Sequence, residues 1–412
     1  MIDKLGKLGP GLLFAASAVG VSHLVQSTRA GADFGLSMGV LITLVCLLKY
    51  PAFRFGAEYA AIARESVLDG YARQGRWLLV VFFIAIAIEG FAVIPAVSLV
   101  TAGMAINVFG ASTNEIVTTS AIVAVASIAL ALGRYRLLEH ASRLFVVVFA
   151  VLTVVATIAT FGILGDMDSL AAPLEPTREN LFFSAAVAGW MPVGMGGSVL
   201  LSVWVLAKSD VSGRPVSVKD ALFDFNIGYA ATTLLALCFL VMGTALLFGR
   251  GIDMAASSTG FAAQLIALFT STVGAWIRPV IGIAALAVMF STVITVVDGF
   301  PRVYANVARR LTARLTRAPS ETQLYLAFIG LQAIVAIVLL FFFVTSFGVF
   351  IDFATTAGFI VAPIVAYLNH RIMTSTTIAP ERRPPTWLRA WSRVGIGALA
   401  VASLTYLYFR FL

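Results

Sequence analysis

The stretch SAVGVSHLVQSTRAG, residues 17–31, decides how this sequence folds. It lies in an apolar run long enough to cross a bilayer as a helix, yet Gly20 and Ser22 flank Val21, and polar side chains follow: His23, Gln26, Ser27, Thr28 and Arg29. In a bilayer core every backbone group needs a partner, so irregular backbone is tolerated only where it is buried in protein or lines a wet cavity. The stretch therefore predicts a membrane helix that is interrupted near residues 20–23.

The composition is that of an integral membrane protein. Of the 412 residues, 60% are hydrophobic and 12% are charged, and the mean hydropathy is +0.97. Apolar spans of about 20 residues recur along the chain, whereas a barrel would show short alternating strands. We expect an all-α membrane fold with about eleven transmembrane helices, near residues 11–31, 37–60, 78–103, 115–133, 143–165, 181–207, 221–248, 271–297, 323–345, 347–369 and 391–411.

The whole chain, residues 1–412, is expected to form a single transmembrane domain, because no polar connection is long enough for a soluble one. We expect two halves of five helices each, residues 1–165 and 180–370, and an extra C-terminal helix at 390–412. The longest polar connections are expected to be loops: 64–76, 166–179, 208–220, 302–321 and 371–389.

Lysine and arginine gather in every second connection, beginning with Lys4 and Lys7 at the N-terminus. Basic loops are retained in the cytoplasm, so this pattern predicts a multi-pass protein of the inner membrane with a cytoplasmic N-terminus. The net charge of +8 then reflects loops that face anionic lipid, and no aromatic-and-basic motif indicates nucleic-acid binding. Cys46 and Cys238 lie within predicted helices, which indicates neither a disulfide nor a cysteine metal site.

A second interruption is predicted in AVAGWMPVGMGGSVLLS, residues 186–202, where Pro192 lies at mid-membrane among several glycines. Proline removes a helical hydrogen bond, and glycine makes an unwound segment less costly. The two breaks fall in helices one and six, which correspond if each half has five helices. Paired breaks of this kind indicate the substrate site of an inverted-repeat transporter, although kinks that serve only packing are the alternative for either break alone.

Ionisable residues within the predicted spans are candidates for function, because burying them in a bilayer is costly. Glu89 is the only one in its apolar span, and we predict that it carries protons; the alternative is a structural partner of Arg29 or Lys49. His23, beside the first break, is a candidate proton-titrating group or metal ligand, or else a donor to a carbonyl across the helix gap. Met191 abuts the second break and is a candidate thioether ligand or core filler.

Three segments resemble the NRAMP family of proton-coupled divalent metal transporters, which have eleven or twelve helices and the LeuT-type inverted repeat. GPGLLFAASAVGVSHLVQSTRAGADFG, residues 9–35, is similar to the first helix of that family. MPVG, residues 191–194, is similar to its Met-Pro-His-Asn motif in helix six, and FSTVITVVDGFPRV, residues 290–303, resembles its helix-eight pattern more loosely. The resemblance implies a LeuT-type 5+5 inverted repeat with broken helices 1 and 6.

The sequence departs from the NRAMP pattern at the residues that hold the metal. Where the family has Asp-Pro-Gly-Asn, this chain reads Gly20, Val21, Ser22 and His23. Glycine therefore replaces the anionic ligand, and histidine replaces the amide ligand. In helix six the His and Asn of the family are Val193 and Gly194, while Ala188 falls where the family offers a backbone carbonyl. Glu89 occupies the position of an acidic residue on the family's proton route.

These features predict a secondary transporter that works by alternating access, with proton symport as the expected coupling. The resemblance implies a metal cation as substrate, and the missing carboxylate leaves a small polar organic solute, an amino or organic acid, as the alternative. We expect no cofactor and no enzymatic activity; the expected partners are the substrate, protons and membrane lipid. The predicted site residues are Gly20, Ser22, His23, Ala188, Met191 and Gly194 for substrate, Glu89 and His23 for protons, and His23 and Met191 for a metal.

Overall fold

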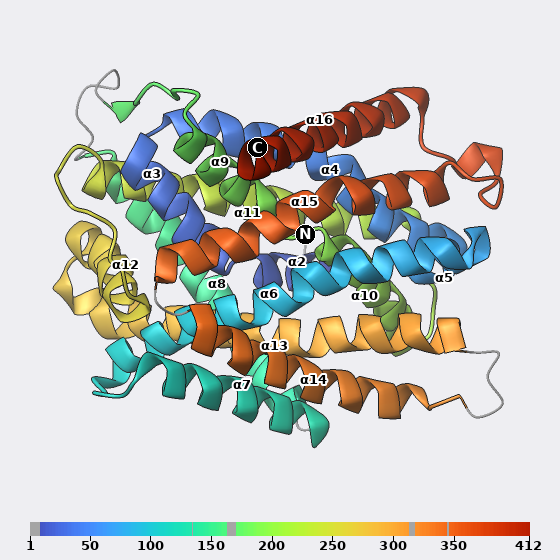
Figure 1. Ribbon diagram of the computed structural model, residues 1–412, viewed down its shortest axis with the longest axis horizontal. Helices are drawn as coiled ribbons and strands as arrows, with labels where there is room; N and C mark the ends of the chain where they lie inside the picture. The colour runs from blue at the N-terminus through green and yellow to red at the C-terminus, as the bar shows by residue number, and fades with distance from the viewer. Residues whose placement is uncertain (1–8, 134, 163–169, 313–317, 344–345) are drawn as a thin grey trace.

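The computed structural model describes the backbone of residues 9–133, 135–162, 170–312, 318–343 and 346–412. Regular structure in these ranges is helical, apart from one isolated bridge between Gly35 and Ala171. Lys4 and Lys7, with which the orientation argument begins, lie outside the described residues, so the cytoplasmic N-terminus stays a prediction. Figure 1 shows the helices running lengthwise through the bundle, side by side.

Seven helices in the described ranges are long and apolar enough to cross a membrane. They are α4 (Ser37–Ala63), α6 (Arg76–Phe109), α11 (Val218–Leu247), α13 (Arg278–Thr312), α14 (Glu321–Phe343), α15 (Phe347–Met373) and α16 (Thr386–Phe411). Two further apolar helices, α7 (Glu115–Ala131) and α8 (Tyr135–Thr160), correspond to the fourth and fifth predicted spans. Together with the two broken helices below, these elements confirm the predicted all-α membrane fold.

Both predicted interruptions are present. The first helix consists of α2 (Pro10–Ala18), a π-helical turn η1 (Ser22–Ser27) and α3 (Thr28–Phe34). The sixth consists of α9 (Arg178–Trp190) and α10 (Gly196–Ser212), joined by residues 191–195. The α-helical hydrogen bonds stop at the residues that predicted the breaks. These are glycine and serine in the first helix, and proline with glycines in the sixth.

Two helices were not predicted. The connection 64–76 was expected to be a loop, which is wrong, because residues Val67–Gln74 form α5. Ser66 and Asp69 form a reciprocal capping box at its start, and α5 buries Val67, Leu68 and Tyr71 on one face. The second is α12 (Ser258–Val273), capped by Ser257, whose 16 residues are too few to be recognised as a membrane span. Two short 3₁₀ turns complete the structure, η3 (Ala275–Ile277) and η4 (Pro380–Arg382).

The broken helices lie within a shell of continuous ones. In this packing α6 contacts α13 and α15, while α11 covers α2 and α3, and α9 lies against α15. Figure 1 shows α16 along one edge of the bundle and α7 with α14 along the opposite edge, and α14 and α16 are largely exposed. Gly189 permits the approach of α9 to α15, since a Cβ there would overlap the backbone carbonyl of Thr355. The two breaks are thus held away from the outer surface.

Candidate functional site

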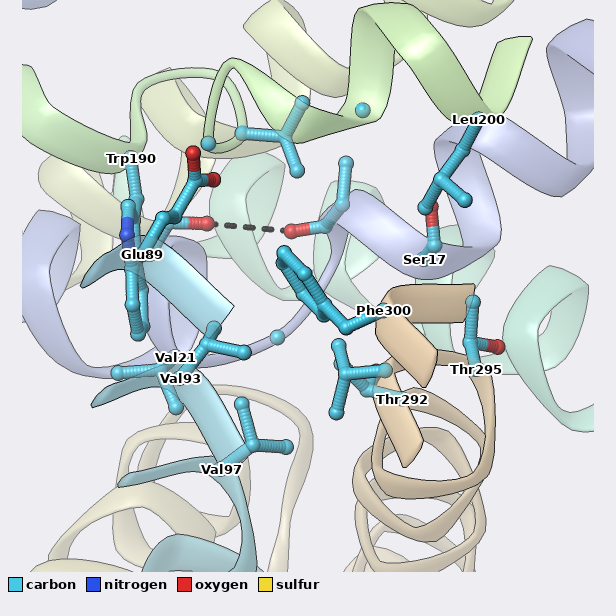
Figure 2. Close-up of a pocket in the computed structure, with 17 residues that line it drawn as sticks. Ser17, Val21, Glu89, Val93, Val97, Trp190, Leu200, Thr292, Thr295 and Phe300 are labelled. Atoms are coloured by element: carbon cyan, nitrogen blue, oxygen red, sulfur yellow. Dashed lines mark hydrogen bonds between the residues drawn. The ribbon is translucent and has the colours of Figure 1, made fainter. Parts of the chain in front are cut away.

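A pocket with a volume of about 60 Å³ lies where the two breaks meet α6 and α13. Figure 2 shows its side chains converging from these four elements. The residues that line it include Ser17, Gly20, Val21 and Ser22 of the first helix, Glu89, Val93 and Val97 of α6, Trp190, Val193, Gly194 and Leu200 of the sixth helix, and Thr292, Thr295 and Phe300 of α13. We call it the central cavity.

The central cavity is apolar with few polar groups. Glu89 is the only ionisable side chain among its lining residues, and hydroxyl groups of serine and threonine supply most of the other polarity. Trp190 lies beside Glu89, and the ring of Phe300 points into the middle of the space (Figure 2). A mostly apolar lining with a few polar groups and one convergent charge is typical of sites for small organic molecules.

The Glu89 carboxylate lies against the start of α10. Its two oxygens accept a hydrogen bond from the Gly196 amide at 3.3 and 3.4 Å, and its side chain is only 2% exposed. The amides in the first turn of a helix lack helical partners and favour a negative charge. A Cβ on Gly194 would overlap one of the carboxylate oxygens, so glycine at this position makes room for Glu89.

Ser22 and His23 face in different directions. The Ser22 hydroxyl donates to the Ala18 carbonyl at 3.1 Å, the contact drawn as a dashed line in Figure 2, and lines the central cavity. His23 is fully buried: Nε2 donates to the Thr232 carbonyl at 2.9 Å, and Nδ1 lies 2.9 Å from the Ser22 hydroxyl. Both ring nitrogens are therefore engaged within the protein, and His23 is behind the wall of the cavity.

Ala188 and Met191 also lie behind that wall. The Ala188 carbonyl accepts a hydrogen bond from Lys49 Nζ at 2.6 Å, and the Met191 sulfur accepts one from the Ser27 hydroxyl at 3.9 Å. Of the predicted substrate residues, the cavity brings together Gly20, Ser22 and Gly194 with the predicted proton carrier Glu89. No group of three or more His, Cys, Asp or Glu side chains suited to a metal occurs in the described ranges.

An ion pair joins the first broken helix to α15. Arg29 of α3 donates to both oxygens of Asp352 on α15, at 2.6 and 3.1 Å. Gln26 donates to Asp352 at 2.9 Å, and the Arg29 guanidinium lies 4.9 Å from the centre of the Phe183 ring on α9. We call this set the Arg29 latch. It ties both broken helices to α15. No local sequence motif indicated it, because Arg29 and Asp352 are 323 residues apart.

A second tie lies at the end of the bundle where α5 is placed in Figure 1. Arg310, in the last turn of α13, forms an ion pair with Asp69 of α5. Burial alone would raise the pKa of Asp69, but the hydroxyl of Ser66 and the guanidinium of Arg310 outweigh it, and the pKa lies below its ordinary value. Both ties therefore pair an acidic and a basic side chain from different helices.

The fold is shared with solved transporters. A variant of the Eremococcus coleocola manganese transporter superposes with a TM-score of 0.71 at 14% identity, over 96% of this chain and 85% of that one. MhsT in complex with L-phenylalanine superposes at 0.68, with 15% identity over 97% and 98% of the two chains. A Na⁺-coupled sialic acid symporter gives 0.60, with 11% identity over 97% and 89%. At these identities the likeness shows the fold, which is the predicted LeuT type.

The sequence itself matches no family model. It is 33% identical over 409 residues to an uncharacterised protein of Pasteurella multocida, PM0681, and the match covers 98% of this chain and 92% of the relative. The aligned region extends over nearly all of both proteins and therefore spans the two breaks. The chain belongs to the same family as this Pasteurella multocida protein.

Proposed function

We propose that this protein is a secondary transporter which moves a small organic solute bearing an amino group, by alternating access around the central cavity. One observation carries the proposal: the only ionisable side chain in an otherwise apolar cavity is the carboxylate of Glu89. A protonated amine would bind Glu89, and an apolar body would pack against Val93, Val97 and Phe300. This favours the organic solute that the sequence left as the alternative.

The contacts around the breaks argue against a metal cation as the substrate. A divalent cation needs several oxygen, nitrogen or sulfur ligands to replace its water. The two groups predicted as metal ligands already have partners: His23 binds Thr232 and Ser22, and the Met191 sulfur accepts from Ser27. Glu89 remains as a single carboxylate in the cavity.

The fold is compatible with organic substrates. Among the proteins of similar fold, MhsT was solved with L-phenylalanine, and another is a sialic acid symporter. The manganese transporter shows that the fold also accommodates a metal. The lining of the cavity, rather than the fold, therefore supports the choice of substrate.

We further propose that Glu89 couples transport to protons. The carboxylate bridges the cavity and the first amide of α10, so its protonation would weaken its contact with Gly196 while removing the charge that holds an amine. A proton and an amine would then compete for the same oxygens. Substrate and proton would bind Glu89 in alternation, so we propose exchange of an amine for a proton in place of the symport expected from the sequence.

Binding to the purified protein tests the substrate class. The probes are phenethylamine, isoamylamine, leucine, phenylalanine, citrate and manganese chloride, each assayed by the shift in the melting midpoint. We expect stabilisation by the amines in the wild type and its loss in Glu89→Gln. Glu58→Gln is the matched control, because Glu58 pairs with Arg54 within α4, away from the cavity. Stabilisation by manganese alone would contradict the proposal.

A further inference from the structure

Lys49 is a buried lysine that points at the end of a broken helix. It lies on α4 with a fully buried side chain, and its Nζ donates to the carbonyls of Ala188 and Gly189 at 2.6 and 2.7 Å. A lysine is costly to bury in a membrane, so its retention at this point requires strong acceptors. Both acceptors belong to the last turn of α9.

The break itself frees these two carbonyls. The carbonyl of Ala188 would bond to the amide of residue 192 in a continuous helix, but Pro192 has no N–H to donate. The carbonyl of Gly189 loses its partner because α9 ends at Trp190 and Met191 is extended, with φ −88° and ψ 126°. Unpaired carbonyls at a helix C-terminus carry partial negative charge, and such half-helix ends coordinate cations in transporters of this architecture.

We propose that the Lys49 ammonium is a tethered cation, which fills the carbonyl site at the end of α9 that a free ion would otherwise occupy. The side chain supplies one positive charge and two hydrogen-bond donors to that position, so neither a metal nor a sodium ion has to bind there. The site is thus a latent cation site whose natural occupant is part of the chain. Removing the lysine side chain should convert it into a site for an ammonium-sized monovalent cation.

The opposite side of the break has the complementary arrangement. Glu89 places a carboxylate at the start of α10, where the helix presents unpaired amides, and Lys49 places an ammonium at the end of α9. Both half-helices are therefore capped by side chains of the charge that each end favours. The unwound segment 191–195 is held by charges of the protein itself, with no ligand required to complete it.

Two substitutions of Lys49 separate a tethered cation from a purely structural contact. Lys49→Ala removes the ammonium and leaves room for a free ion, whereas Lys49→Met removes the ammonium but keeps a chain of similar length in its place. Lys219→Ala is the control for loss of one positive charge, because Lys219 is exposed on α11. Each protein is purified and its melting midpoint is measured in ammonium, methylammonium, sodium, manganese and choline chloride.

We expect Lys49→Ala to melt below the wild type in choline and to regain roughly 2–4 °C or more in ammonium or methylammonium. Lys49→Met should stay destabilised in every salt. The wild type and Lys219→Ala keep Lys49 in place, so any gain they show in ammonium or methylammonium through Glu89 should be smaller than that of Lys49→Ala. If Lys49→Ala is recovered poorly, the yield of monodisperse protein extracted in ammonium against choline gives the same comparison. Equal melting or equal yield of Lys49→Ala in all salts, or a gain in ammonium no larger than that of the wild type, would overturn the inference.

Only one consequence of this inference rests on the proposed transport function: coupling would need no free ion at the end of α9. The melting experiment compares variants with the wild type in the same salt, so it can succeed or fail whichever solute is transported. Failure of the amine panel with rescue of Lys49→Ala would reject the proposed substrate class alone. Success of the panel without rescue would reject the tethered cation alone.

Discussion

Replacing Asp352 by asparagine tests whether the Arg29 latch controls access to the central cavity. The substitution keeps the shape of the side chain but removes the charge that receives two bonds from Arg29, at 2.6 and 3.1 Å. Gln26 can still bond to an asparagine oxygen, so the change affects mainly the ion pair. The latch joins α3 to α15 and lies against α9, hence its loss should favour the state in which these helices part.

The magnitude follows from the exposure of the pair. The side chains of Arg29 and Asp352 are 15% and 32% exposed, so the pair lies between an exposed ion pair, worth up to ~1 kcal/mol, and a buried one, whose disruption costs ~3–5 kcal/mol. We expect a loss of about 1–2 kcal/mol of closed-state stability. That corresponds to a change of about 5- to 30-fold in the ratio of closed to open molecules.

A cysteine in the cavity reports on this ratio. Cys46 and Cys238 are free and buried, and both are first replaced by alanine. Thr292→Cys then introduces a single thiol into the cavity lining, and its reaction with a membrane-impermeant maleimide is timed from each side of sealed vesicles. Labelling from the side of Arg29 should rise about 5- to 30-fold in Asp352→Asn, in proportion to the population shift.

The control for this experiment is Glu58→Gln, which removes an ion pair contained within α4 and should leave both labelling rates unchanged. An unchanged rate in Asp352→Asn would refute the reasoning, because the latch would then have no effect on access. An equal rise from both sides would refute it as well, since it would report general loosening of the bundle.

Two further predictions concern the cavity and the opposite end of the bundle. Gly194→Ala should abolish amine binding in the melting assay, because its Cβ would overlap the Glu89 carboxylate. Gly197→Ala should still bind amines, because its Cβ would meet only side-chain atoms at 3.2 Å or more. Equal amine binding by the two variants would contradict this role of Gly194. For Asp69, the pKa in the folded protein is lower than in the unfolded chain, so its contribution to stability is present above about pH 4 and is lost as the pH falls through the folded-state value. The melting midpoint of the wild type should therefore fall more steeply below pH 4 than that of Asp69→Asn, and parallel curves would contradict the Arg310 pairing.

Most of the fold could be predicted because a bilayer imposes long apolar spans and penalises every interruption. The breaks at residues 20–23 and 191–195 were evident from glycine, serine and proline within such spans. The elements that escaped prediction are α5 and α12, which are too short to cross a membrane. The polar composition of α5 resembles that of a loop, and α12, although apolar, has only 16 residues.

The site was predicted less completely, because a sequence gives the position of a side chain along a helix but not the direction in which it points. Glu89 and Gly194 were both singled out, yet only the structure shows that the glycine accommodates the carboxylate. The sequence indicated Lys49 as a partner of Glu89 or as a lysine near a helix end, whereas it binds the carbonyls at the end of α9. Gly20 stands where metal transporters of the resembled family have an acid. The carboxylate of the central cavity comes from Glu89 of α6 instead.

Uptake by the protein in proteoliposomes, with phenethylamine and manganese offered under the same proton gradient, tests the central claim most directly. The account predicts that the wild type accumulates the amine in exchange for protons, that Glu89→Gln abolishes this accumulation, and that Glu58→Gln retains it. Accumulation of manganese without the amine, or amine exchange that persists in Glu89→Gln, would contradict it.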